Sequence, residues 1–124
     1  MTTSRFNRYW LPVVVYCAAI FIQSAFPTTE QLPQWTHLDK ILHVAAYALL
    51  GFLFFRALAT GRLNYNRNIL FILSILLSSL YGLSDEIHQS FVPGRSAEAS
   101  DALADLVGGF LGAGCGWLWY RGSF

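Results

Sequence analysis

Four long apolar segments dominate this sequence and leave little room for any fold other than a membrane bundle. They run from Tyr9 to Phe26, from Ile41 to Ala59, from Ile69 to about Ser90 and from Ala102 to Tyr120. Each is close to the roughly 20 residues that a helix needs to cross a bilayer. Lipid offers the backbone no hydrogen-bond partners, and a helix supplies its own. The pattern therefore predicts an all-α, polytopic membrane protein with four transmembrane helices, in one domain over residues 1–124.

The composition excludes the main alternatives to this class. Hydrophobic residues make up 55% of the chain and charged residues only 12%, whereas an ordinary soluble domain has about a quarter charged residues. A disordered chain needs the opposite balance. A net charge of +1 without a basic stripe argues against nucleic-acid binding. A cleaved signal peptide is the alternative for the first segment, but Gln23 stands where the cleavage pattern requires a small residue.

The basic residues indicate how the chain is oriented in the membrane. If it crosses four times, six of its eight Lys and Arg residues fall on one side, namely Arg5, Arg8, Arg56, Arg62, Arg67 and Arg121. The other side holds Lys40 and Arg95, and all seven acidic residues lie at or near it. Cytoplasmic loops carry the excess of Lys and Arg. We therefore predict that both termini are in the cytoplasm.

Ionisable residues at membrane depth are costly and are candidates for function by default. At the start of the second apolar segment, the helical spacing of Asp39, His43 and Tyr47 places them on one face. Lys40 lies beside that face, where its long side chain is expected to reach the water boundary. His43 lies deeper among apolar neighbours, so it is the stronger functional candidate of the two.

The third segment ends in a second polar group. Asp85 and Gln89 share a helical face, with Glu86 and His88 on its flanks, and the face continues backwards through Tyr81, Ser78 and Ser74. Serine stripes commonly pack against a neighbouring helix. Two consecutive carboxylates followed by His and Gln are harder to explain by packing.

The turn and the fourth segment complete the pattern. Pro93 and Gly94 break the helix, which leaves Arg95 able to fold back over the carboxylates. Asp101 and Asp105 follow on one face, and favourable interaction with the helix dipole is the alternative explanation for them. Further along, small residues recur every fourth position, at Gly108, Gly112 and Gly116, here called the glycine ladder. Such a ladder predicts close packing, either inside the bundle or against a second copy in a homo-oligomer.

Taken in order, these segments resemble the VanZ-like family of small bacterial membrane proteins, which is associated with teicoplanin resistance. The resemblance covers about residues 12 to 118 and rests on the following elements: Gln23-Ser24-Ala25-Phe26-Pro27, Asp39-Lys40, His43, Tyr47, Asp85-Glu86, Gln89, Phe91, Pro93, Arg95, Asp101 and the glycines from Gly108 to Gly112. It implies a multi-pass protein of the bacterial cytoplasmic membrane, and the distribution of Lys and Arg predicts that the polar group faces outside. The family often has Asn where this chain has Asp105, and Phe where it has Val44.

These considerations define a candidate substrate-binding site made of Asp39, His43, Tyr47, Asp85, Glu86, Gln89, Arg95 and Asp101. The favoured function is binding of an amphipathic cell-envelope molecule, such as a membrane lipid, an envelope precursor, or a glycopeptide or lipopeptide. One alternative is an enzyme acting on a lipid-linked substrate, with His43, Asp85 and Glu86 as catalytic candidates. The other is a structural polar network without a ligand.

No metal or cofactor is expected from the sequence. The Cys and His residues do not have zinc-site spacing. A metal set of His43, His88, Asp85 and Glu86 is an open alternative, but its spacing is not diagnostic.

The orientation can be tested by labelling engineered cysteines. In a background lacking Cys17 and Cys115, single cysteines at Gln34 and Glu98 should react with an impermeant maleimide on intact cells, and one at Asn64 should not. Labelling at Asn64 alone would mean that the predicted topology is inverted.

Overall fold

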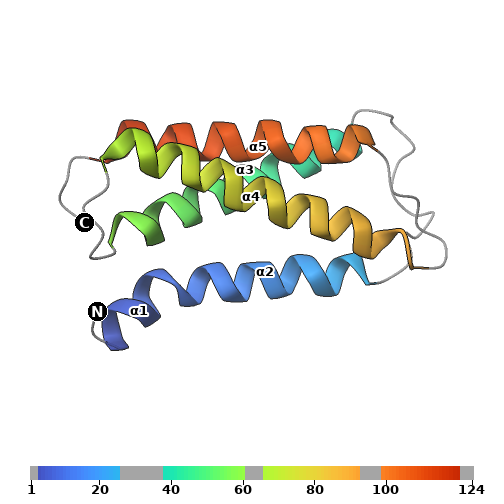
Figure 1. The fold of residues 1–124 in the computed structure, drawn as a ribbon. Helices are drawn as coiled ribbons and strands as arrows, with labels where there is room; N and C mark the ends of the chain where they lie inside the picture. The colour runs from blue at the N-terminus through green and yellow to red at the C-terminus, as the bar shows by residue number, and fades with distance from the viewer. Residues whose placement is uncertain (1–2, 26–37, 61–65, 93–98, 121–124) are drawn as a thin grey trace.

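The computed structural model describes residues 3–25, 38–60, 66–92 and 99–120, and every regular element in these ranges is helical. The chain forms a bundle of roughly parallel and antiparallel rods (Figure 1). In chain order the helices are α1 (Thr3–Tyr9), α2 (Leu11–Ser24), α3 (Leu38–Ala59), α4 (Arg67–Gln89) and α5 (Ala99–Trp119). The predicted all-α class is confirmed.

Three of the described helices are long and apolar enough to cross a membrane, which agrees with the predicted membrane class. They are α3 over Lys40–Ala59, α4 over Arg67–Gln89 and α5 over Ala99–Trp119. The first apolar segment differs, because it is divided into α1 and α2, and α2 has only 14 residues. A crossing needs roughly 20 residues. The fourth crossing and the orientation therefore stay predictions.

A proline explains the division of the first segment. Pro12 lies in the first turn of α2 and has no N–H, so it cannot donate to the carbonyl of Arg8 four residues earlier. The guanidinium of Arg56 donates to this carbonyl at 3.2 Å and also lies 4.9 Å from the centre of the Tyr9 ring. A side chain of α3 thus replaces the helical hydrogen bond that the proline removes.

Helix α4 shows how the sequence pattern determines packing. Its start is capped by Asn66, whose side chain accepts a hydrogen bond from the backbone N–H of Ile69 at 2.9 Å. One face is buried along its whole length and carries mostly small or polar side chains, namely Leu70, Ser74, Ser78, Gly82, Asp85, Glu86 and Gln89. Leu76 and Leu80 on the other side are exposed. The polar stripe faces the protein, and the apolar side is left for lipid.

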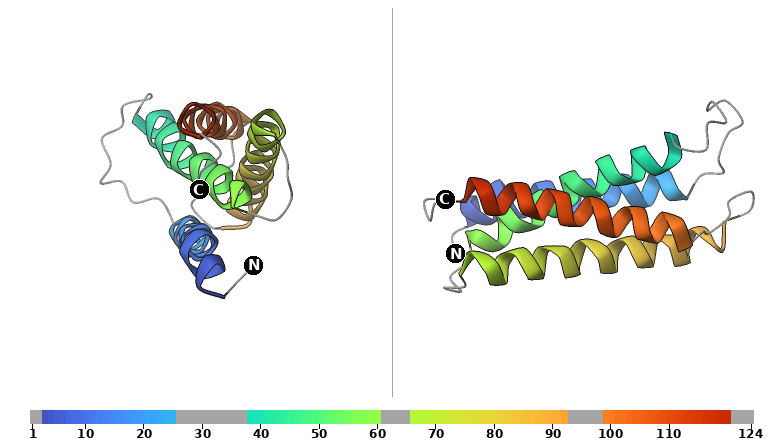
Figure 2. Two further views of the ribbon diagram at one scale, coloured as in Figure 1. Left: turned by 90° about the vertical axis from the view of Figure 1, so that its left-hand side faces the viewer. Right: turned by 90° about the horizontal axis from the view of Figure 1, so that it is seen from above.

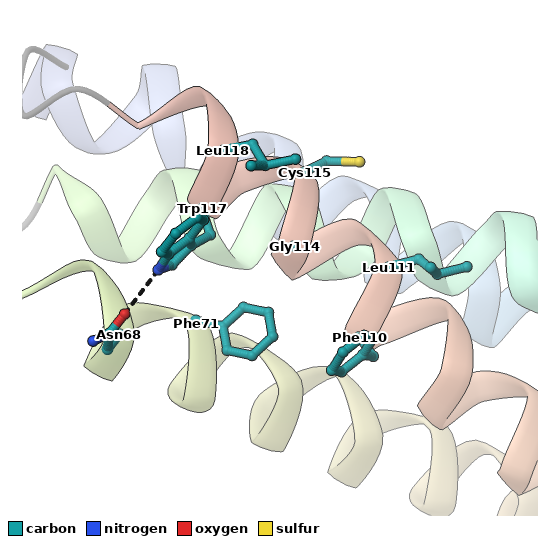
Figure 3. Close-up of a pocket in the computed structure, with 8 residues that line it drawn as sticks. All are labelled: Asn68, Phe71, Phe110, Leu111, Gly114, Cys115, Trp117 and Leu118. Carbon is teal, nitrogen blue, oxygen red and sulfur yellow. Dashed lines mark hydrogen bonds between the residues drawn. The ribbon is translucent and has the colours of Figure 1, made fainter.

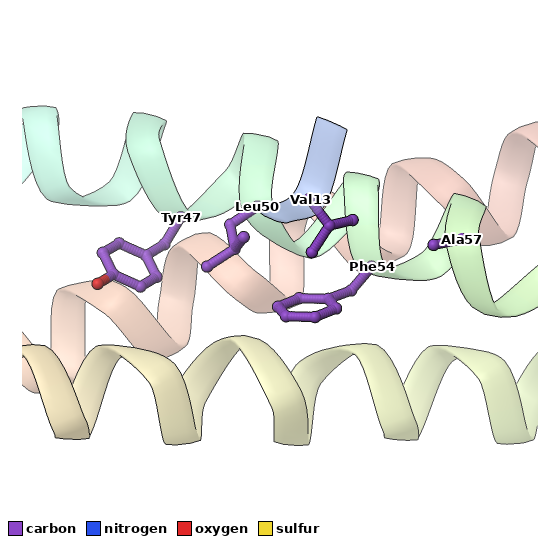
Figure 4. Close-up of a cluster of buried hydrophobic side chains, with 5 residues drawn as sticks. All are labelled: Val13, Tyr47, Leu50, Phe54 and Ala57. Carbon is purple, nitrogen blue, oxygen red and sulfur yellow. The ribbon is translucent and has the colours of Figure 1, made fainter. Parts of the chain in front are cut away.

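The helices α3, α4 and α5 pack against one another, with the α3–α5 contact the most extensive, and α2 lies more loosely along α3 and α4 (Figure 2). Helix α2 is joined to the bundle by a small apolar cluster (Figure 4). Its members are Val13, Tyr47, Leu50, Phe54 and Ala57, all almost fully buried. The described helices thus form a tight unit of α3, α4 and α5, with α2 packed at its side.

The glycine ladder packs inside the bundle, against α3. A Cβ atom added at Gly112 would lie 1.7 Å from the carbonyl oxygen of Ala48, and one at Gly108 would lie 2.4 Å from that of Val44. A Cβ atom at Gly116 would meet the ring of Phe55 at 2.6 Å. Of the two uses predicted for the ladder, the structure shows the first. The homo-oligomer stays a prediction, and it would need a face other than these buried glycines.

Replacing Gly112 by Ala tests this packing against a matched control. The new methyl group collides with backbone of α3, so we expect destabilisation by about 1–3 kcal/mol. A Cβ atom at Gly114 meets only the edge of the Phe71 ring at 3.9 Å. Gly114→Ala therefore shares the gain in helix propensity without the collision. The melting temperature in detergent should fall for Gly112→Ala and not for Gly114→Ala. Equal melting temperatures for the two variants would contradict the close packing of Gly112 against α3.

Candidate functional site

The buried polar side chains gather at one end of the bundle. There α2 and α4 end while α3 and α5 begin (Figure 1). We call this group the polar cluster: Ser24, Lys40, His43, Tyr47, Asp85, Glu86, Gln89, Asp101 and Asp105. Most of these side chains are at most 5% exposed, and only Lys40 and His43 are partly accessible. Four helices that lie far apart in the sequence therefore contribute to one site.

One interaction of the polar cluster joins α3 to α5 deep in their contact. The Nδ1 atom of His43 lies 2.7 Å from Oδ1 of Asp105, and the Asp105 side chain is 1% exposed. A carboxylate at this distance fixes the orientation of an imidazole ring and determines which ring nitrogen carries the proton. His43 is held there because Gly108, one turn beyond Asp105, lets the backbones of α3 and α5 approach closely.

A second pair lies nearer the surface of the same helix contact. The ammonium group of Lys40 forms an ion pair with Oδ1 of Asp101. The Lys40 side chain is 31% exposed, and its ammonium group is directed at a specific carboxylate. Its place at the water boundary stays a prediction. Asp101 therefore does more than compensate the dipole of α5.

Gln89 links α2 to α4. Its amide Nε2 donates to Oδ2 of Asp85 and to Oγ of Ser24, both at 3.2 Å. The Ser24 side chain is fully buried at the end of α2. This link holds the loosely packed α2 to the polar cluster through a hydrogen bond rather than through apolar contact alone.

Tyr47 lies at the boundary between the polar cluster and the apolar core. The ring belongs to the apolar cluster, and its hydroxyl points toward the end of the bundle where α3 begins (Figure 4). Tyr47 is 2% exposed, and its hydroxyl has no hydrogen-bond partner among the described residues. The carboxylates of Asp85, Glu86 and Asp105 are close enough to act on it electrostatically. The hydroxyl is thus a buried polar atom directed into an acidic site.

Acidic groups outnumber basic ones among the described members of the polar cluster. Four acidic residues are buried, namely Asp85, Glu86, Asp101 and Asp105, beside the single ammonium of Lys40 and the imidazole of His43. Buried charge is costly and persists where it is paired or functional. Chemically, this arrangement can attract a cation, accept hydrogen bonds from a polar headgroup, or orient His43 as a general base.

The structure brings together six of the eight residues that the sequence proposes for the site: His43, Tyr47, Asp85, Glu86, Gln89 and Asp101. Arg95 lies outside the described residues, as does the side chain of Asp39, which falls in the first turn of α3. The functional roles of all eight stay predictions.

Three members of the polar cluster, Ser24, Lys40 and Asp105, are not among the site residues that the sequence proposes. The sequence places Ser24 in the family resemblance and Lys40 at the water boundary. It marks Asp105 by the face it shares with Asp101 and as a position where the family often has Asn. The signal for Asp105 was its position one turn before Gly108, which predicts close approach to another helix. His88 belongs elsewhere, because its ring stacks on that of Phe21 with centroids 4.4 Å apart.

A separate surface groove of about 520 Å³ lies between α4 and α5 toward the opposite end of the bundle (Figure 3). Apolar side chains form most of its wall, including Phe71, Phe110 and Leu118. At its end the Trp117 indole donates to Oδ1 of Asn68 at 2.8 Å, and the Arg67 guanidinium lies 3.6 Å from the centre of the indole ring. The groove is therefore not the polar pocket that the sequence predicts.

The comparisons with known proteins agree with the resemblance inferred from the sequence. A family model described as VanZ/LLP1 matches residues 3–120, which is nearly the whole chain. No curated protein and no solved structure gives a significant match.

Two double-mutant cycles would rank the helix contacts of the polar cluster. For His43→Ala and Asp105→Ala we expect a coupling of about 1.5–3 kcal/mol, because the hydrogen bond involves a charged group and its two side chains are only 14% and 1% exposed. For Lys40→Ala and Asp101→Ala we expect at most about 1 kcal/mol, because water screens the partly exposed ammonium. Thermal unfolding in detergent provides the measurement. Equal couplings would show that burial does not determine the strength of these pairs.

Proposed function

This chain belongs to the VanZ/LLP1 family, and we propose that its polar cluster binds the headgroup of an amphipathic cell-envelope molecule. The observation that carries the proposal is the gathering of buried carboxylate, amide, hydroxyl and imidazole groups at one end of an otherwise apolar bundle. A membrane protein tolerates such a group where it serves a polar ligand or pathway.

The surroundings of the polar cluster suit an amphipathic ligand, with a polar headgroup and an apolar chain. Large apolar side chains are exposed beside it, including Ile41 at 60%, Ile87 at 56% and Leu103 at 60%. An acyl chain lying against these faces would place its headgroup at the ends of α3, α4 and α5. Most of the buried polar atoms there are acceptors, so hydroxyl and amine groups of the headgroup are the matching chemistry.

We also propose where the site lies in the cell. The distribution of Lys and Arg favours both termini in the cytoplasm of a bacterium, four crossings, and the polar cluster at the outer face of the cytoplasmic membrane. In that position the site would meet envelope lipids, their precursors and antibiotics of the glycopeptide or lipopeptide class.

One observation favours a catalytic role as the second candidate. Asp105 accepts a hydrogen bond from the His43 ring and so orients His43 in the manner of a general base, and the neighbouring carboxylates would stabilise the imidazolium form. In such an enzyme His43 would take a proton from water attacking a lipid-linked substrate. The binding proposal needs the same residues without that step, so conversion of the bound lipid distinguishes the two.

The test is lipid retention by purified variants. Asp85→Asn keeps the size of the side chain, and Arg95→Ala removes a charge at the membrane edge, so both variants should fold. Each variant removes one charge of the proposed site, so retention of the bound lipid and any resistance phenotype should fall about tenfold or more. Ser90→Ala, an exposed position one residue beyond α4, serves as the control.

Mass spectrometry of co-purifying lipids is read beside membrane abundance and melting temperature. Normal abundance with normal retention in both variants would contradict the binding proposal. Loss of retention that follows loss of folded protein would favour a purely structural network. Time-dependent change of the retained lipid by the wild type would favour the enzyme.

A further inference from the structure

We propose that His43, Glu86 and Asp105 form a binding site for a divalent first-row transition metal, zinc in particular. The inference rests on the geometry of the polar cluster and stands independently of the headgroup proposal. The three residues come from α3, α4 and α5, and each offers one ligand atom within 4.8 Å of the other two. Ligands around one zinc ion at bond lengths of about 2.0–2.2 Å are at most about 4.4 Å apart. Small side-chain adjustments therefore complete the site.

Two buried polar atoms are directed into the same space. Oδ2 of Asp105 has no hydrogen-bond partner among the described residues, although Oδ1 of the same carboxylate is engaged with His43. The hydroxyl of Tyr47, a residue that is 2% exposed, also has no hydrogen-bond partner among the described residues. Buried polar atoms almost always have a partner, and a bound ion or its water is one of the explanations for an exception. The hydroxyl of Tyr47 points to a ligand independently of the acidic cluster.

A glycine forms one wall of this space. A Cβ atom at Gly82 on α4 would lie 2.9 Å from Oδ2 of Asp105 and 3.2 Å from Cε1 of Tyr47. Any larger residue would therefore press on the unpartnered oxygen. Gly82 lies one turn before Glu86 on α4. The glycine that leaves room for the ion and the glutamate that would bind it are thus on neighbouring turns of one helix.

The donor set indicates the class of metal. One imidazole nitrogen favours zinc, copper, iron or nickel over magnesium and calcium, and two carboxylates bring the charge that balances a divalent cation. Zinc binds such mixed nitrogen and oxygen sites more tightly than manganese in the general order of affinities. The Asp101 carboxylate is engaged with Lys40 and lies outside the set, which makes it a natural control.

The experiment uses the full chain in detergent, with Cys17 and Cys115 changed to Ser so that thiols do not bind the probe. Protein freed of metal by a chelator is titrated with zinc chloride and, separately, with manganese and magnesium chloride. We expect one zinc per chain, weaker binding of manganese, and a rise in melting temperature of about 4 °C or more at saturating zinc. No retained zinc and no rise would overturn the proposal.

Variants assign the ligands. Losing an outer-shell partner costs roughly 10- to 100-fold in metal affinity, so His43→Gln, Glu86→Gln and Asp105→Asn should each lose at least that much. Asp101→Asn should bind zinc like the parent chain. Unchanged zinc affinity in all three ligand variants, or an equal loss in Asp101→Asn, would overturn the assignment.

X-ray absorption spectroscopy of the zinc-loaded parent chain keeps the proposal testable if a ligand variant fails to fold. The expected first shell contains nitrogen and oxygen at about 2.0–2.2 Å and includes imidazole scattering. A shell without imidazole would overturn the site. Loss of the zinc site with lipid retention intact would overturn the metal proposal and leave the headgroup proposal standing. Zinc binding without lipid retention would overturn the headgroup proposal and leave the metal site standing.

Discussion

The close contact between α3 and α5 is the constraint on which the rest of this structure depends. Gly108 and Gly112 bring the backbone of α5 against that of α3, where a methyl group has no room. Since lipid removes the hydrophobic driving force between helices, such dispersion contacts and the polar bonds beside them must hold the bundle together. The same approach sets Asp105 against His43 and Asp101 against Lys40. Packing and site geometry are therefore consequences of one helix contact.

The periodic features of the sequence were enough to predict α3, α4 and α5 and the buried face of α4. Asp85 and Gln89, one turn apart, share a buried face with Ser74 and Ser78, because helical spacing fixes which side chains lie together. The apolar lengths of α3, α4 and α5 similarly determine the class of fold. These properties belong to single helices, and a single helix is what a periodic pattern describes.

Properties that involve two helices could not be predicted in the same way. The glycine ladder predicts close approach but not the partner, and the structure supplies α3. The His43–Asp105 pair depends on the rotation of α5 about its axis, and the ladder fixes that rotation only after its partner is known. Pro12 was visible in the sequence, yet its effect includes a hydrogen bond from Arg56 that no local pattern contains.

The position of the polar cluster at an end of the bundle follows from electrostatics. A carboxylate at the centre of the bilayer costs several times what it costs near the interface, where water and long side chains such as Lys40 compensate it. Going inward, the polar face of α4 changes from carboxylates to Gly82 and then to the hydroxyls of Ser78 and Ser74. Charge is thus confined to the depth at which it can be paired. The tight, neutral contacts below it hold the ends of α3, α4 and α5 in fixed positions, which is what a binding site of either proposed kind requires.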